Sequence, residues 1–311
     1  MSEPVTIKRG TEIELEIESL AYGGMGLARI ENFVIFVKYA IPGQKVLARI
    51  YKKRKGYAEA QVLETLVESP NAVDVCCKHY WICSKIQSLS YDEQIKEKSS
   101  QVEDAFVRLG GFLNFKLDKV QKANLIYHYR NKMEFTFSPN RWVLESEPEG
   151  VDKSFALGLH IPGRFDKILD IHNCHIQHEI GNKILAAARE VCLANPELRP
   201  YDPRSHIGFL RFLMLRFGVN TGDLMVNVVT SYHDIDKLSP LIDLLLEKFP
   251  EITSLVNNVN TRKADVAFGE YETLLYGKPF IQEKIGDLTF EISANSFFQT
   301  NTPRVKFFTK K

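Results

Sequence analysis

The chain has 311 residues, 44% of them hydrophobic and 25% charged, and a formal net charge of +1 at pH 7. It is long enough for two or more domains that each bury a core. Its near-neutral charge excludes a general attraction to polyanions, so nucleic-acid affinity would have to come from local patches. The N-terminus has no apolar segment of a secretory signal, no apolar run is long enough to span a bilayer, and the five cysteines are unevenly clustered. We therefore expect a cytoplasmic protein without a disulfide scaffold and without a membrane partner.

Short runs of alternating polar and apolar residues fill the first part of the chain and predict β-strands. The predicted strands are 11–19, 27–30, 33–37, 45–51 and 57–63, with turn residues such as Gly23-Gly24 and Pro42-Gly43 between them. Five strands at this spacing predict a small closed barrel over residues 1–68.

Four cations lie between the last two predicted strands: Lys52, Lys53, Arg54 and Lys55, flanked by Tyr51 and Tyr57. Cations on a hairpin tip beside aromatic rings suit a phosphate backbone and unpaired bases. The simpler interpretation is a solvated turn that keeps an edge strand soluble. The pattern Ala21-Tyr-Gly-Gly-Met-Gly-Leu-Ala-Arg29, followed by the apolar run 33–37, resembles the TRAM domain, an OB-like RNA-binding barrel. That resemblance favours RNA contact by the four cations over a turn that is merely solvated.

A cysteine cluster marks the next segment, residues 69–89, which contains Cys76-Cys77-Lys-His-Tyr-Trp-Ile-Cys83. Together with the distant Cys174 it resembles the iron–sulfur motif of RNA uracil-5 methyltransferases, Cys-x5-Cys-x2-Cys with a remote fourth cysteine. Cys77 and Cys83 have the x5 spacing, but Ile86 stands where the motif has its third cysteine, and only Cys76 could replace it.

The resemblance therefore implies an incomplete site for a [4Fe–4S] cluster, which usually needs four thiolates. Two other interpretations stay open. Three cysteines with His79 or His172 could hold zinc, or the cysteines are reduced thiols without a metal.

The segment 90–125 begins with Ser90-Tyr-Asp-Glu93, which predicts a capping box. Apolar residues at helical spacing follow, up to Leu109, and Gly110-Gly111 ends the predicted helix. The helix is amphipathic, and the family resemblance implies that it packs on a catalytic domain.

The segment 126–290 contains the string Tyr129-Arg-Asn-Lys-Met-Glu-Phe135, which closely resembles a signature of RNA (uracil-5-)-methyltransferases, enzymes that use S-adenosylmethionine (SAM). Arg130 and Lys132 are two apart on a predicted strand and could clamp consecutive phosphates, or form a salt-bridge ladder on a solvated face. Arg211 resembles a family residue near the RNA groove; the alternative is a surface arginine with a buried stem. Strands predicted at 208–216, 224–230 and 254–260, with helices at 180–194 and 235–249, indicate a mixed domain of antiparallel strands and helices.

The last pattern in the chain is Ser296-Phe-Phe-Gln-Thr-Asn301, in which Phe297 and Gln299 resemble residues that face the target base and the methyl donor. Core packing is the alternative for Phe297. In the family a cysteine thiolate adds to C6 of the base, C5 accepts the methyl group and a base removes its proton. No Asp-x-x-x-Gly-x-Gly unit follows a strand in this chain, and no cysteine follows Cys192.

We therefore expect an α+β chain with a five-stranded OB-like TRAM barrel and a central α+β domain. A Rossmann-like methyltransferase domain is expected to be missing, with 291–311 as its stub. The expected function is the RNA-binding portion of a SAM-dependent RNA (uracil-5-)-methyltransferase for ribosomal RNA. We expect the chain itself to have no catalytic residue, to bind no SAM and to be inactive. The alternatives are one half of a split enzyme whose catalytic domain is a separate polypeptide, a free-standing RNA-binding module, and a redox or iron-sensing protein that uses the cysteines.

Overall fold

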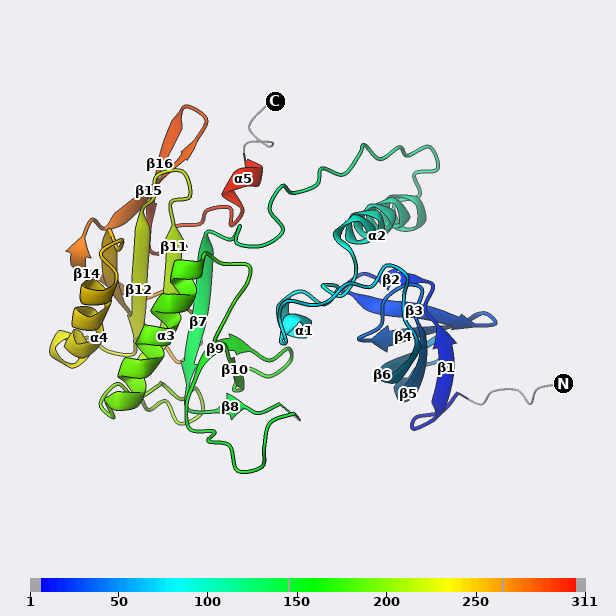
Figure 1. The fold of residues 1–311 in the computed structure, drawn as a ribbon, viewed down its shortest axis with the longest axis horizontal. Coiled ribbons are helices and arrows are strands. Elements are labelled where there is room, and N and C mark those ends of the chain that lie inside the picture. Colours follow the sequence, from blue (N-terminus) through cyan, green and yellow to red (C-terminus); the bar gives the residue numbers. More distant parts are fainter. Residues whose placement is uncertain (1–6, 145, 265, 306–311) are drawn as a thin grey trace. The chain divides into compact units, whose positions relative to one another are not determined.

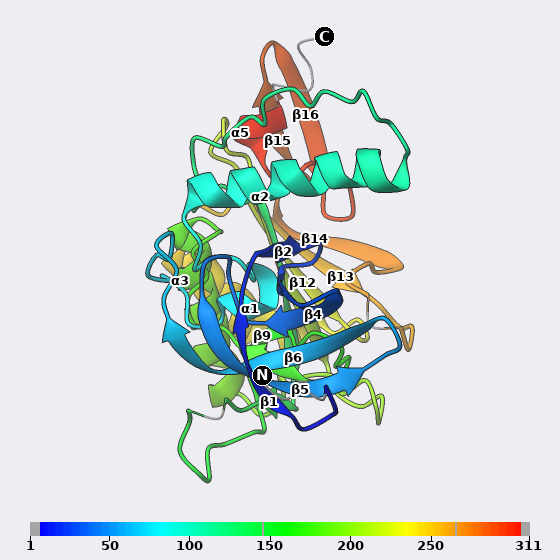
Figure 2. The same ribbon diagram turned by 90° about the vertical axis from the view of Figure 1, so that its right-hand side faces the viewer.

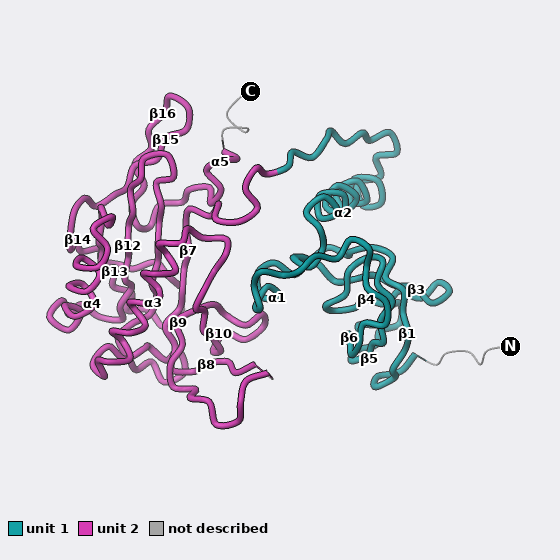
Figure 3. The backbone as a smooth tube through the Cα atoms, in the orientation of Figure 1, with its two compact units in different colours: residues 1–122 teal, residues 123–311 magenta. Residues whose placement is uncertain are grey.

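The computed structural model describes residues 7–144, 146–264 and 266–305. The chain divides into two compact units, Met1–Lys122 and Ala123–Lys311, which Figure 3 shows in teal and magenta.

The first unit begins with a six-stranded sheet of order β1-β5-β6-β4-β3-β2 (Figure 1). Its strands are β1 (Glu12–Glu16), β2 (Ser19–Ala21), β3 (Met25–Ile30), β4 (Phe33–Lys38), β5 (Lys45–Lys53) and β6 (Tyr57–Val67). The prediction of five strands is corrected, because the first predicted strand is divided into β1 and β2. The backbone N–H of Ile17 donates to Gln44 and that of Glu18 to Leu27, so the chain changes partner there. β1 then pairs with β5 and β2 with β3, which joins the two edges of the sheet through one bent stretch.

Helix α1 (Tyr80–Cys83) and helix α2 (Tyr91–Asp104) follow, and a π-helical turn η1 (Ala105–Leu109) extends α2. The capping-box prediction is wrong: the Ser90 side chain makes no capping hydrogen bond, and Glu93 pairs with Lys96 instead. Polar contacts hold α2 beside β2 (Figure 2), since a Glu97 carboxylate oxygen accepts from the Leu20 N–H at 2.9 Å. No residue of α2 is buried; Ile95 is half-buried and Val102 is exposed, so its apolar stripe is only partly covered.

The second unit is built on an eight-stranded sheet of order β14-β13-β12-β11-β7-β9-β10-β8. Its strands are β7 (Lys132–Ser138), β8 (Arg141–Trp142), β9 (Ala156–His160), β10 (Ile168–Asp170), β11 (Leu210–Phe217), β12 (Leu224–Thr230), β13 (Ser254–Val259) and β14 (Tyr271–Gly277). Neighbours are antiparallel except β12–β13 and β10–β8, which are parallel. Helices α3 (Glu179–Ala194) and α4 (Ile235–Lys248) lie side by side over one face of this sheet (Figure 1).

The β15–β16 hairpin, Phe280–Ile285 and Leu288–Ser293, packs on the sheet through Ile281 and Ile292, which contact Met225 and Val256. Strands β11, β12 and β13 are buried along their whole length because both of their faces are covered. The predicted segment boundary at 290–291 falls inside β16. Helix α5 (Thr302–Val305) comes last, and residues 306–311 of the predicted stub lie outside the described residues. None of the helices in the described ranges is long and apolar enough to cross a membrane.

Candidate nucleic-acid interface

The outer face of the barrel carries aromatic rings together with cations. Because alternate residues of a strand point to opposite faces, Phe36 and Tyr57 point outward while their neighbours Ile35 and Ala58 are buried. The rings of Phe36 and Tyr57 meet edge to face with centroids 5.6 Å apart, and the Lys38 ammonium lies 4.6 Å from the Tyr51 ring. Rings of this kind on an exposed sheet can stack unpaired bases.

The four predicted cations have different surroundings at the β5–β6 tip. Lys52 pairs with Glu59, which also accepts a hydrogen bond from the Tyr51 hydroxyl at 2.9 Å. The hydrogen bond from Lys52 lowers the pKa of Glu59, whereas burial, helped by Glu59, raises the pKa of Tyr51. Lys53, Arg54 and Lys55 are exposed. Three of the four cations are therefore placed to meet a polyanion, and RNA contact by the tip remains a prediction.

Arg130 and Lys132 make contacts within their own strand region. The Arg130 Nε donates to the Lys132 carbonyl at 2.8 Å, and Lys132 pairs with Glu134, two residues further along the same face of β7. The Lys132 ammonium also lies 5.9 Å from the centre of the Phe268 ring. The ion pair expected in the alternative interpretation is thus present, but it runs along one strand and not across a ladder. The phosphate clamp remains a prediction.

Arg211 is buried, which contradicts the surface arginine of the alternative interpretation, and its place near an RNA groove stays a prediction. It is only 2% exposed, and its guanidinium donates to the carbonyls of Asn260, Arg262 and Ala264 at 2.6–2.8 Å. The guanidinium also stacks over Tyr201, 4.3 Å from the ring centre. Arg211 is therefore not a surface arginine. It holds the 260–264 loop in place, and any effect on RNA would act through that loop.

The loop that carries Phe297 and Gln299 is anchored on both sides. Before Phe297, the buried Arg216 donates to the carbonyls of Ala294, at 3.0–3.2 Å, and Ser296. Burial lowers the pKa of Arg216 to about 10. After Phe297, the Asn131 side chain donates to the Gln299 carbonyl at 2.9 Å and to the Thr302 hydroxyl at 2.7 Å.

Between these anchors the side chain of Phe297 is 87% exposed and Gln299 is also exposed, whereas Phe298 packs on the core below the loop. The core packing that the alternative interpretation expected for Phe297 is thus found for Phe298, while Phe297 is exposed. Sequence reasoning missed Arg216 and Asn131; the one available signal was the place of Asn131 inside the signature string.

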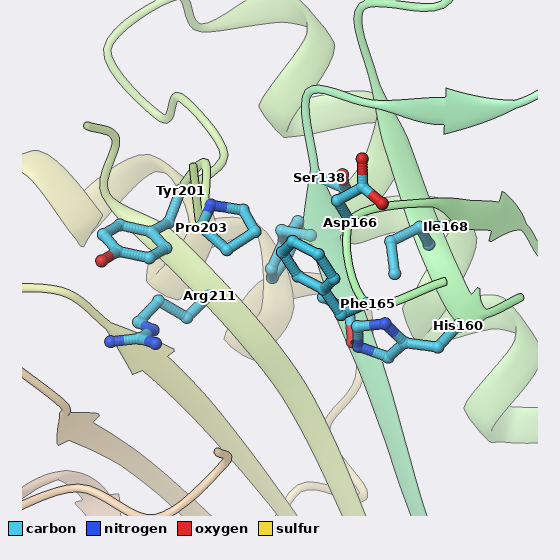
Figure 4. Close-up of a pocket in the computed structure, with 10 residues that line it drawn as sticks. Ser138, His160, Phe165, Asp166, Ile168, Tyr201, Pro203 and Arg211 are labelled. Atoms are coloured by element: carbon cyan, nitrogen blue, oxygen red, sulfur yellow. The ribbon is translucent and has the colours of Figure 1, made fainter. Parts of the chain in front are cut away.

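A small hollow in the second unit is lined by His160, Asp166, Tyr201 and Arg211, among others (Figure 4). Its volume is about 10 Å³, which is room for one water molecule at most. Asp166 pairs with Arg204, and His160 contacts the Thr136 hydroxyl at 3.2 Å. Asp166 and His160 therefore already have partners within the protein, and the hollow is too small for a base or a methyl donor.

Within each of the two units, the cysteines that the structure describes are not part of a metal site. No group of three or more His, Cys, Asp or Glu residues that could hold a metal ion occurs there. Cys76 and Cys83 are exposed, while Cys77 and Cys174 are buried, each within its own unit. The predicted iron–sulfur set of Cys77, Cys83 and Cys174, with Cys76 as a substitute, and the zinc alternative are therefore without structural support.

Thiol reactivity should follow this difference in burial. Burial raises the pKa of Cys174, and that of Cys192 to about 12, so both are protonated near neutral pH. At about pH 8 we expect iodoacetamide to label Cys76 and Cys83 at least about a hundredfold faster than Cys192, because the thiolate is the reacting form. Mass spectrometry of timed samples measures this, and labelling of Cys192 at the rate of Cys83 would contradict it.

Comparison with known proteins agrees with parts of this picture. The TRAM domain model matches residues 7–63. A protein of Porphyromonas gingivalis named an uncharacterized RNA methyltransferase is 38% identical over 93% of this chain and 64% of its own length. One of the same description from Chlorobaculum tepidum is 41% identical over 84% of this chain and 55% of its own length. The chain thus spans between about half and two thirds of the length of these relatives.

One solved structure is similar over most of the chain. It is the Pyrococcus abyssi tRNA (uracil-54, C5)-methyltransferase in complex with S-adenosyl-L-homocysteine, with a TM-score of 0.69 and 23% identity. The likeness covers 96% of this chain and 63% of that chain. The fold-class prediction is corrected by this finding. It assigned only residues 291–311 to a methyltransferase domain and described the rest of that domain as missing, whereas the fold of the solved methyltransferase extends through the large mixed sheet and its helices. The prediction that the methyltransferase domain is missing is therefore wrong.

Proposed function

We propose that these residues form the RNA-binding part of a SAM-dependent RNA (uracil-5-)-methyltransferase that acts on an unpaired segment of ribosomal RNA. The observation that carries RNA binding is the barrel face, where outward aromatic rings lie beside Lys38 and the exposed cations 53–55. The methyl-transfer chemistry is supported by the relatives named RNA methyltransferases. The choice of uracil C5 as the methylated atom and of ribosomal RNA as the substrate rests on the family resemblance of the signature string Tyr129–Phe135.

The anchored loop supplies the second contact of the proposal. Because Arg216 and Asn131 hold the backbone on both sides, Phe297 and Gln299 are presented to solvent on an anchored loop. An aromatic ring fixed in this way can stack on a base without the entropy cost of ordering the loop. We assign base stacking to Phe297 and a polar contact with the base or the methyl donor to Gln299.

The proposal is tested by measuring RNA binding and methyl transfer with the whole chain. Fluorescence anisotropy with ribosomal RNA fragments and with tRNA, at increasing salt, gives affinity and charge dependence. Incubation with tritium-labelled SAM then reports methyl transfer, which we do not expect from these residues alone. We expect binding of single-stranded ribosomal RNA segments that weakens with salt. Preferential binding of tRNA would change the substrate class, and absence of RNA binding would refute the proposal.

A separate polypeptide carrying the catalytic residues has no support among these findings.

The expectation that these residues alone do not bind SAM or transfer methyl groups stays a prediction. It rests on the sequence, in which no Asp-x-x-x-Gly-x-Gly unit follows a strand and no cysteine follows Cys192. Titration calorimetry with SAM measures it directly. A stoichiometric site for SAM would contradict it, and RNA binding without SAM binding would agree with it.

Phe297 and Phe298 form a matched pair that separates binding from stability. The Phe297→Ala variant should unfold at the same denaturant concentration as the wild type, since an exposed ring contributes within about 0.5 kcal/mol. It should weaken RNA binding about tenfold, because stacking one base contributes roughly 1–3 kcal/mol. The Phe298→Ala variant should instead lose about 2 kcal/mol of stability. Urea denaturation and anisotropy distinguish the two; equal destabilisation by both substitutions would contradict the assignment.

A further inference from the structure

A second hollow in the sheet unit, of about 650 Å³, lies where β12 and β13 end. Ser231 and Tyr232 follow β12, and Thr261 and Lys263 follow β13. Lys237 of α4 and the segment 196–209 supply the rest of the wall. β12, α4 and β13 form a parallel β-α-β unit. The carboxyl ends of parallel strands are where such units bind ligands, and this volume lies in the range of roughly 300–1,000 Å³ that small-ligand sites have.

The walls of this hollow are fixed by backbone contacts. Gly208 has φ +123°, and a Cβ there would lie 2.1 Å from the Pro200 carbonyl oxygen, so only glycine lets these two segments meet. The Ser231 hydroxyl donates to the Gly208 carbonyl at 2.6 Å. Arg211 holds the carbonyls of the 260–264 loop, which carries the lining residue Lys263. The hollow is therefore built into the fold.

Aromatic rings form much of its lining. The Phe209 and Tyr232 rings lie 4.9 Å apart between centroids, and Tyr232 is 42% exposed. The Tyr201 hydroxyl and the His206 Nδ1 are 2.9 Å apart, and His206 is exposed. An exposed ring supported by a buried one offers a flat apolar surface of the kind on which a base stacks.

The charges of the lining favour an anion. Arg199, Lys237 and Lys263 line the hollow, while Glu197 is the one carboxylate among its described lining residues. Glu197 accepts from Lys237 at 3.1 Å, and Lys237 also donates to the Tyr232 hydroxyl at 3.1 Å. The remaining cations, Arg199 and Lys263, are exposed. A planar ring beside two exposed cations combines base stacking with phosphate contact.

We propose that this hollow binds one unpaired nucleotide of an RNA strand, with the base on Tyr232 and a phosphate between Arg199 and Lys263. The inference rests on the proposed function, because it assumes that the chain binds RNA. It places a nucleotide at the carboxyl ends of β12 and β13, in residues separate from those of the barrel tip and the Phe297 loop. It also gives Arg211 a role as a positioning residue, which keeps the wall with Lys263 in place.

The test uses a short oligouridylate that carries 5-iodouridine, bound to the whole chain and irradiated. We expect mass spectrometry to find a cross-link to Tyr232 or His206. Tyr232→Ala should weaken binding about tenfold, the effect of losing one stacked base, whereas Tyr232→Phe keeps the ring and should bind as the wild type does. The double variant Arg199→Ala/Lys263→Ala should weaken binding and give a shallower salt dependence. The matched control is Tyr271→Ala, since Tyr271 is 66% exposed on β14 and does not line the hollow.

The outcomes separate this inference from the proposed function. The Lys53→Ala/Arg54→Ala/Lys55→Ala variant changes only the barrel tip. If that variant loses affinity while no cross-link falls in the hollow and Tyr232→Ala binds as tightly as the wild type, the nucleotide site is wrong and the proposed function stands. Absence of RNA binding by the wild type overturns both. If uridine 5′-monophosphate alone binds as tightly as the oligonucleotide, the hollow takes a free nucleotide, which overturns its assignment to an RNA strand.

Discussion

Replacing Glu283 with alanine is expected to lower the free energy of unfolding of the second unit by about 3–5 kcal/mol. Glu283 lies on β15 and is fully buried. Its carboxylate accepts hydrogen bonds from the backbone N–H groups of Val219, Asn220 and Lys284 and from the Thr302 hydroxyl, all at 2.8–3.0 Å. Alanine would leave these donors without an acceptor, and each buried unsatisfied donor costs roughly 1–3 kcal/mol.

The control for this prediction is Glu291→Ala, because Glu291 is exposed on the adjacent strand β16 and should change stability by less than about 0.5 kcal/mol. Urea denaturation can follow the second unit alone if Trp81 is replaced by phenylalanine, which leaves Trp142 as the reporter. Glu283→Gln, which keeps an acceptor oxygen, should lie between the two. Equal losses for Glu283→Ala and Glu291→Ala would contradict the role of the buried carboxylate.

Glu283 also shows what the sequence could not reveal. Its partners at 219–220 and 302 are far from it in the chain, and so are the carbonyls at 294–299 that Arg216 and Asn131 hold. Contacts of this kind leave no periodic pattern. The contacts of Arg211 were equally hidden from the sequence. An arginine on an apolar strand gives the same sequence pattern whether its guanidinium faces solvent or binds three carbonyls.

Local patterns were more informative where one face of an element meets solvent. In β1 the buried residues Ile13 and Leu15 alternate with exposed glutamates, and a strand was predicted there. The same pattern could not show the break between β1 and β2, which depends on Ile17 and Glu18 changing hydrogen-bond partners. The capping box failed because Glu93 has a competing partner in Lys96.

The prediction of a missing domain failed for a different physical reason. It was drawn from the absence of two motif features, an Asp-x-x-x-Gly-x-Gly unit after a strand and a cysteine after Cys192. A fold depends instead on which residues are buried. Strands β11–β13 are buried along their whole length, and the likeness to a solved methyltransferase covers 96% of the chain. Motif residues therefore bear on chemistry, while the buried pattern bears on architecture.

The barrel tip should have the largest effect on RNA binding. Replacing Lys53, Arg54 and Lys55 together with alanine is expected to weaken binding of single-stranded RNA by about 10–100-fold at low salt. It should also reduce the slope of log affinity against log salt by about 2, since each phosphate contact contributes roughly 0.7. The three side chains are exposed at the β5–β6 turn, so the barrel should keep its stability. Anisotropy titrations at several salt concentrations measure both quantities.

Lys52 supplies the matched control for this prediction. It is held by Glu59 beside the Tyr51 hydroxyl, so its ammonium is already neutralised by a carboxylate in the free protein. A phosphate would have to displace Glu59 before Lys52 could contribute, and Lys52→Ala should therefore change the salt slope much less than the triple substitution. If the triple variant kept the wild-type slope, the cations would serve only to keep the turn solvated, and RNA contact would have to be sought on the ring-bearing face of β4–β6 and on the Phe297 loop.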